Sequence, residues 1–137
     1  MKATILLCDA AQASDGKLNM LGAGWNVIGP QAAPFAIALL IDVPWDATGR
    51  SHHFDLTLVD ADGRPVTPIG ATNHVGVGGD FNVNRPEGLR EGSDLRMPLA
   101  ITFGPLALPP GQRYVWHLDI DGERDESWIA PFDVRPA

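Results

Sequence analysis

Cysteine is almost absent from this chain, since Cys8 is the only one among 137 residues. A single cysteine forms no disulfide within the chain and excludes both a disulfide framework and a cysteine-based zinc site. A chain of this length buries roughly 68 % of its unfolded surface, which is enough for a core without such cross-links. We therefore expect one domain over residues 1–137, in a reducing compartment such as the cytoplasm.

Basic residues are scarce and scattered. Lysine and arginine number 10 against 17 acidic residues, which gives a net charge of -7. Nucleic acids and anionic membrane surfaces attract clustered positive charge, so neither is expected as a partner. Long hydrophobic runs are missing too, because residues 3–8 form an apolar stretch too short for a signal peptide or a membrane span.

Helical periodicity is replaced by an alternation of apolar and polar residues, which is most regular near the C-terminus. The alternation predicts a hairpin of two strands with one apolar side. Its residues on that side are Tyr114, Trp116, Leu118 and Ile120 on one strand, and Trp128, Ala130, Phe132 and Val134 on the other. A second sheet must cover such a surface, which predicts a β-sandwich.

The same pattern predicts the remaining strands. Residues 35–43 are apolar on both faces and are the best candidate for a central strand. Pro98 implies that the strand at 95–103 lies at an edge or carries a bulge at that point, and glycines make 75–83 a short or irregular edge strand. Residues 9–17 and 84–94 are predicted as loops. The expected fold is all-β, an antiparallel sandwich of seven to nine strands with little or no helix.

Residues 108–114, with the sequence LPPGQRY, resemble the corner that precedes strand F in fibronectin type III and other immunoglobulin-like sandwiches. In that corner a tyrosine buries its ring and returns its hydroxyl group to the backbone upstream. The resemblance implies an immunoglobulin-like fold and says nothing of function.

A longer resemblance covers nearly the whole chain. Its segments are residues 8–11, 15–22 and 58–63, then Tyr114 with the stretch 118–123. Together they are similar to a widespread bacterial family of unknown function, whose members share Asp-Gly-Lys-Leu-Asn near the start and a Tyr-strand-Asp-Gly hairpin near the end. The resemblance assigns no catalytic residue.

Metal-competent side chains are present, but without the close pairing of a structural metal site. The candidates are His53, Asp55, His117, Asp119 and Asp121. Residues 119–126 carry an Asp-x-Asp-Gly that is read as a turn between strands rather than as a calcium loop. No cofactor is expected.

No catalytic set is assembled either. The chain lacks a Gly-x-Ser-x-Gly motif, and Cys8 in an apolar run is expected to be buried and inert rather than nucleophilic. The glycines at 76–79 precede no helix, so they are read as a flexible edge strand and not as a phosphate cradle.

The preferred hypothesis is therefore a non-catalytic interaction or structural module that contacts proteins through an edge strand or its loops, and a free edge would favour a homodimer. Its interaction candidates are Trp45, Arg50, Arg85, Leu89 and Arg90. Trp45 either caps an open end of the sandwich, which we favour, or anchors a partner. The alternatives are a ligand-binding, metal-binding or hydrolytic domain using the His/Asp face, and a subunit of a phage-like or secretion assembly.

Overall fold

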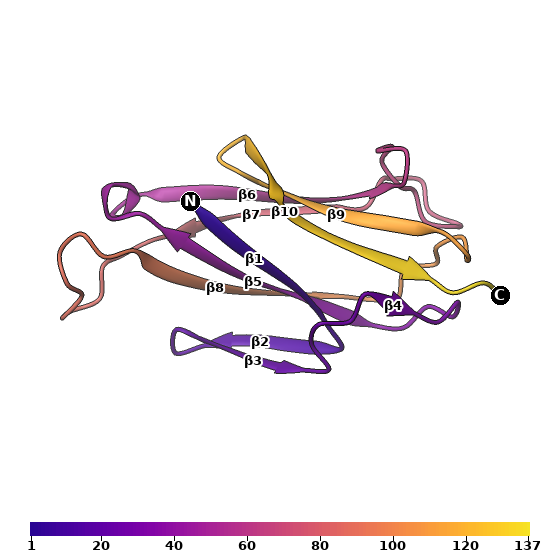
Figure 1. Ribbon diagram of the computed structural model, residues 1–137, viewed down its shortest axis with the longest axis horizontal. Helices are drawn as coiled ribbons and strands as arrows, with labels where there is room; N and C mark the ends of the chain where they lie inside the picture. Colours follow the sequence, from indigo (N-terminus) through magenta and orange to yellow (C-terminus); the bar gives the residue numbers. More distant parts are fainter.

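The computed structural model describes residues 1–137 and is built of strands, with a single 3-10 turn, η1 (Trp45–Ala47). Figure 1 shows the elements as layers that lie along one another. The strands are β1 (Lys2–Cys8), β2 (Ala10–Ser14), β3 (Lys17–Leu21), β4 (Val27–Ile28), β5 (Phe35–Val43), β6 (Ser51–Asp60), β7 (Gly76–Asn82), β8 (Leu95–Phe103), β9 (Arg113–Ile120) and β10 (Glu123–Val134). None of the elements is a helix of the length and apolarity that a bilayer span requires.

One sheet has three antiparallel strands in the order β1-β5-β8. The prediction of a central strand at 35–43 is confirmed, because β5 pairs on both sides and residues 36–39 are all buried. Pro98 lies opposite Leu40 on the edge strand β8, in agreement with the edge position that proline favours.

The other sheet has five strands in the order β4-β10-β9-β6-β7. Strands β9 and β10 form the predicted hairpin around the turn Asp121-Gly122, and the short β4 pairs in parallel with the end of β10. The glycine-rich β7 lies at the other edge and pairs only with β6, which confirms the predicted edge strand.

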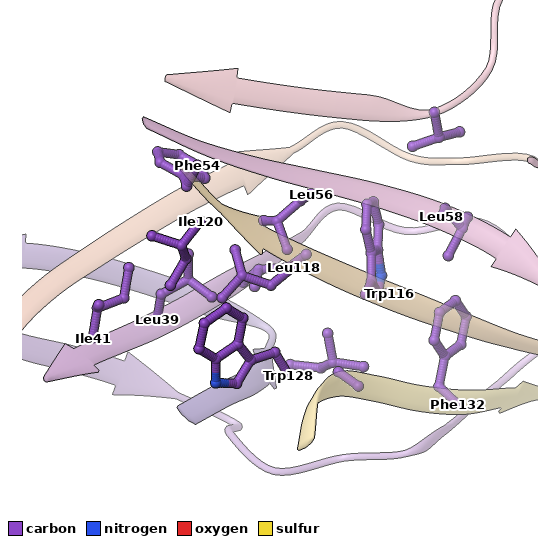
Figure 2. Packing of buried hydrophobic residues seen from close by; sticks show 14 of the residues in the cluster. Leu39, Ile41, Phe54, Leu56, Leu58, Trp116, Leu118, Ile120, Trp128 and Phe132 are labelled. Atoms are coloured by element: carbon purple, nitrogen blue, oxygen red, sulfur yellow. The ribbon is translucent and has the colours of Figure 1, made fainter. Parts of the chain in front are cut away.

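The core lies between these two sheets, as Figure 2 shows. Trp116 on β9 is fully buried and meets Phe35 and Phe103 from the three-stranded sheet at centroid distances of 6.3 Å and 5.2 Å. Burying each large side chain of this kind contributes about 1.5–3 kcal/mol. The eight residues predicted for the apolar side of the C-terminal hairpin are all buried.

The predicted loop at 9–17 is wrong in part, because β2 and β3 form a small hairpin there. It packs on the outer face of the three-stranded sheet over Cys8, Ala36 and Ala38, which are all nearly inaccessible. With this hairpin and the two-residue β4, the chain has ten strands rather than the predicted seven to nine. The strands β2, β3 and β4 are short and mostly exposed, so they show too little apolar alternation to be predicted from the sequence.

The corner before β9 forms through one side-chain hydrogen bond. The hydroxyl group of Tyr114 donates to the carbonyl oxygen of Pro109 at 2.7 Å, and the tyrosine ring is 1 % exposed. Its ring stacks at 5.7 Å on Phe132 of β10.

Candidate functional site

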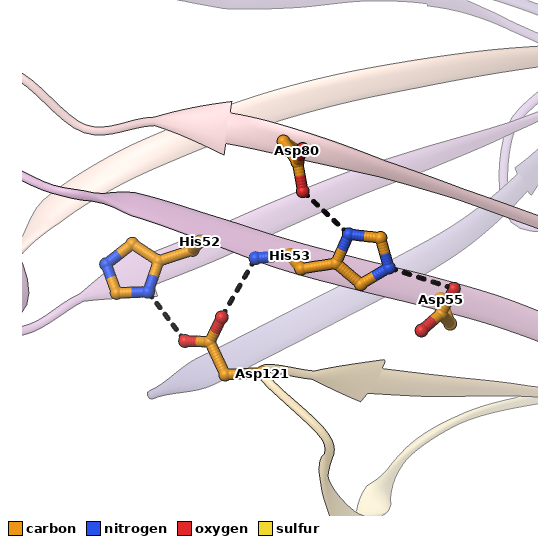
Figure 3. Close-up of polar contacts among 5 residues, drawn as sticks. All are labelled: His52, His53, Asp55, Asp80 and Asp121. Carbon is orange, nitrogen blue, oxygen red and sulfur yellow. Dashed lines mark hydrogen bonds and ion pairs between the residues drawn. The ribbon is translucent and has the colours of Figure 1, made fainter.

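The main polar cluster is centred on two successive histidines of β6. Because successive side chains of a strand point to opposite faces, His52 faces the interior and His53 the solvent. Figure 3 shows both rings with the carboxylates that surround them.

His52 is buried between two hydrogen-bond acceptors. Its Nδ1 lies 2.6 Å from Oδ2 of Asp121, and its Nε2 lies 2.7 Å from the carbonyl oxygen of Ala47. Both contacts are satisfied when both ring nitrogens carry hydrogen, so the geometry calls for an imidazolium paired with a carboxylate. Only 4 % of His52 is exposed, whereas 43 % of the Asp121 side chain is, so the contact joins a buried ring to a carboxylate at the surface.

Asp121 occupies the first position of the two-residue turn between β9 and β10. Its φ of 52° and the 77° of Gly122 are left-handed, as a type I′ hairpin turn requires. The other carboxylate oxygen accepts the His53 backbone N–H at 2.8 Å. Partial burial raises the pKa of Asp121, but the bonds from His53 and His52, with the charges of His52 and Arg50, outweigh it and lower the pKa.

His53 lies on the outer face between two carboxylates. Its Nδ1 is 2.7 Å from Asp80 on β7, and its Nε2 is 3.2 Å from Asp55. The bond to Asp80, followed by that to Asp55, raises the pKa of His53. The Asp55 carboxylate occupies the space that a side chain on Gly78 would need. Both ring nitrogens are thus hydrogen-bonded to carboxylates, and 49 % of the His53 side chain is exposed.

The structure does not bring the five predicted metal candidates together. His53 and Asp55 are hydrogen-bonded, and Asp119 lies directly opposite Asp55 on the neighbouring strand. Arg124 donates hydrogen bonds of 2.7 Å and 3.1 Å to the carboxylate of Asp119. Asp121 instead serves His52. No group of three or more His, Cys, Asp or Glu side chains is arranged to hold a metal ion.

His117, the fifth candidate, is half-buried on the outer face opposite Thr57. Its Nδ1 is buried without a hydrogen-bond partner. Burial lowers the pKa of His117, and the positive charge of Arg124 lowers it further. It joins neither the His52 pair nor the His53 bonds.

Two of the predicted interaction residues meet at the end of the molecule that holds η1. The guanidinium carbon of Arg85 lies 3.5 Å from the centroid of the Trp45 ring, a cation–π contact. Arg85 also donates to Thr48 Oγ1 at 2.6 Å and to the Trp45 carbonyl at 3.0 Å. Trp45 is half-buried under this guanidinium, so its ring is engaged within the chain.

The other three interaction residues make no such contact. Arg50 and Arg90 are exposed, and Leu89 is half-buried in a turn in which its N–H donates to Pro86. Arg50 and Arg90 are candidates by exposure alone, and Leu89 is only partly exposed.

Sequence reasoning missed the pairing of His52 with Asp121 and the part played by Asp80. A signal for His52 was present, since it shares the parity of Phe54, Leu56 and Leu58 and therefore the buried face of β6. Nothing local indicates its partner, which lies 69 residues away.

Comparison with curated proteins gives no match, and neither does comparison with solved structures. A family model does match, under the description "Family of unknown function (DUF6941)", over residues 3–135. The resemblance to a family without an assigned function is confirmed to that extent. The chain belongs to this family of unknown function, DUF6941.

Proposed function

We propose that the protein is a non-catalytic interaction module, with an immunoglobulin-like β-sandwich that pairs with a second copy of itself along β7. The observation that carries the proposal is the open edge of that strand. The contact would join the five-stranded sheets of two copies into one continuous sheet.

The strand order supports an immunoglobulin-like assignment. If β1, β5, β6, β7, β8, β9 and β10 correspond to strands A, B, C, C′, E, F and G, the sheets A-B-E and C′-C-F-G follow in order. The Tyr114 hydroxyl bond lies at the corner before strand F, where this class of fold places it. The hairpin β2–β3 is then an insertion between strands A and B.

The surroundings of the reactive side chains support a non-catalytic role. His52 and His53 each have both ring nitrogens in hydrogen bonds. Cys8 is fully buried, and burial raises the pKa of its thiol, which keeps the nucleophilic thiolate rare. Cys8 Sγ donates to the Leu6 carbonyl and neither histidine bonds to it, so these groups form no nucleophile–base pair with one another.

The backbone of β7 supports strand addition. Val83 N–H donates to Arg50 on the β6 side, so alternation turns the odd-numbered residues of β7 toward β6 and the even-numbered residues outward. The N–H and C=O groups of Gly76, Gly78, Asp80 and Asn82 then have no partner, and all four residues are exposed.

The sequence of β7 favours a second copy over other occupants. Antiparallel pairing about a two-fold axis at Gly79 would set Asp80 opposite Gly78 of the partner and Phe81 opposite Val77. No like charges would then face each other directly, and the inner face would gain aromatic and β-branched pairs. By contrast, the edge strand β8 carries Pro98 and Arg96, residues that discourage pairing.

The test compares two double variants by light scattering after size-exclusion chromatography. Gly76→Pro/Asn82→Pro removes two outward N–H groups from β7, and Gly76→Ala/Asn82→Ala keeps them. We expect the wild type and the alanine variant to be dimers and the proline variant, with unchanged circular dichroism, to be a monomer. A monomeric wild type at high concentration, or a dimer that tolerates both prolines, would overturn the proposal.

A further inference from the structure

The end of the molecule opposite η1 holds a cavity of about 600 Å³. It lies where β5 begins and β10 ends, and the segment 22–34 forms its outer wall. In Figure 1 this segment, which contains β4, lies near the C-terminus. The volume is within the range of small-molecule sites, roughly 300–1,000 Å³.

Aromatic side chains form the fixed wall. Trp25 meets Phe35 at 6.2 Å and Phe132 at 6.0 Å between centroids, both edge to face. Phe35 in turn stacks on Phe103 at 4.9 Å. Because Phe35 and Phe132 belong to different sheets, the core itself holds this wall. Trp25 and Phe35 are half-buried and present its accessible apolar surface, whereas Phe132 is only 3 % exposed.

The opposite wall is made of small residues. The segment 29–34 reads Gly-Pro-Gln-Ala-Ala-Pro, and it lines the cavity along its length. Its residues bring no bulky side chain into the space, so the cavity stays open between a rigid aromatic wall and a slender loop.

Two polar groups of the lining have no hydrogen-bond partner within the chain, the buried Nε1 of Trp25 and the exposed guanidinium of Arg135. Trp25 Nε1 is buried without an acceptor, and it is the one such atom whose residue lines this cavity. Arg135 makes no side-chain hydrogen bond or ion pair, whereas Arg96, Arg113 and Arg124 are each bound to an aspartate through two nitrogens. Asp9, the other charged residue of the lining, lies against Gly22.

We propose that this cavity binds a small amphipathic anion, with a ring system against Trp25, Phe35 and Phe132 and a carboxylate or sulfonate at Arg135. The free guanidinium is the group that selects an anion, since it donates two parallel bonds to such an oxyanion. The site is separate from the β7 edge and from the histidine cluster, so its occupancy does not depend on self-association.

The experiment uses two fluorescent probes that differ by one charged group, 1-anilinonaphthalene-8-sulfonate and its neutral analogue N-phenyl-1-naphthylamine. The folded full-length chain is expected to bind both, the sulfonate more tightly. Arg135→Gln should weaken the sulfonate about tenfold and change the neutral probe less than about twofold, because only the charged contact is lost. Arg64→Gln, an exposed arginine outside the cavity, is the matched control and should change neither.

The variant Ala33→Trp tests whether the probes bind in this cavity, because the larger side chain would fill it from the loop side. It should abolish binding of both probes, and thermal unfolding checks that the fold remains. Amide shifts of the wild type on titration with the sulfonate should cluster at residues 22–35 and 132–135. Absence of binding, equal loss in both arginine variants, or shifts confined to other residues would overturn the proposal.

Discussion

Nδ1 of His52 lies 2.6 Å from Oδ2 of Asp121, although 69 residues separate them in the chain. Through this contact and the bond to Ala47, one buried ring joins η1, the strand β6 and the turn between β9 and β10. A buried charge is tolerated when it is paired and hydrogen-bonded. If one partner is removed, nothing compensates the lost hydration of the other.

Asp121→Asn should therefore destabilise the fold by about 1–3 kcal/mol, as expected when a charged hydrogen-bond partner is removed. Asparagine tolerates the left-handed backbone of this position, so the turn itself is kept. Urea unfolding at neutral pH measures the loss. Asp15→Asn is the matched control, because Asp15 has the same φ of 52° in the turn between β2 and β3 and makes no side-chain hydrogen bond.

The pH dependence of that loss has a defined sign. The pKa of Asp121 is lowered in the folded state from its ordinary value of 3.8, so its contribution is complete above that value and disappears as the pH falls through the folded pKa. The stability difference between wild type and Asp121→Asn should shrink in acid. A difference that stays constant down to the acid transition would contradict the ion pair.

The pKa values of His53 and His117 should differ from the ordinary value of 6.5 in opposite directions. The bonds to Asp80 and Asp55 raise the pKa of His53, while burial and Arg124 lower that of His117. His53 then stabilises the fold below pH 6.5 and loses this effect as the pH rises through its folded pKa, whereas His117 opposes folding as the pH falls below 6.5. NMR titration of the ring protons measures both values.

Asp80→Asn separates the causes in that titration. It removes the largest influence on His53 and should lower the pKa of that residue, while the pKa of His117 should not change. Equal shifts at both rings would show that the variant alters the sheet rather than one hydrogen bond.

Tyr114→Phe should cost about 0.5–1.5 kcal/mol of unfolding free energy, the usual net worth of one hydrogen bond. The ring stays in place on Phe132, and only the bond to the Pro109 carbonyl at 2.7 Å is lost. Thermal and urea unfolding measure the change. A neutral or stabilising substitution would show that this corner does not depend on the hydroxyl group.

Cys8 should be silent toward a thiol reagent such as 5,5′-dithiobis(2-nitrobenzoate) in the folded protein and reactive once the chain is unfolded in urea. Its side chain is fully buried, and burial raises the pKa of the thiol. Cys8→Ala/Ser14→Cys moves the thiol to an exposed strand end and should react at once. Rapid labelling of native wild-type protein would contradict the burial.

The strands that form the core could be predicted from the sequence because their alternation is long and uninterrupted. Residues 35–43 and the C-terminal hairpin are examples, since large apolar side chains occupy every second position there. The hairpin β2–β3 could not be predicted in this way, because it packs through alanines and is mostly exposed.

The candidate sites were accessible to sequence reasoning only where neighbours on one strand were involved. His53 and Asp55 are two residues apart and share a face, which the alternation indicates. The pairing of His52 with Asp121, the stacking of Arg85 on Trp45 and the cavity at Trp25 depend on strand register and loop paths between distant segments. Local pattern carries no information on these distances.

The side chains of Ala36 and Ala38 are small, and this allows the hairpin β2–β3 to pack close to the sheet beneath it. A larger residue at either position would act as a wedge that lifts the hairpin while the interior between the two main sheets keeps its packing. A bulky substitution at Ala36 is therefore expected to make Cys8 reactive while the core between the two main sheets changes little, because the two clusters are packed separately.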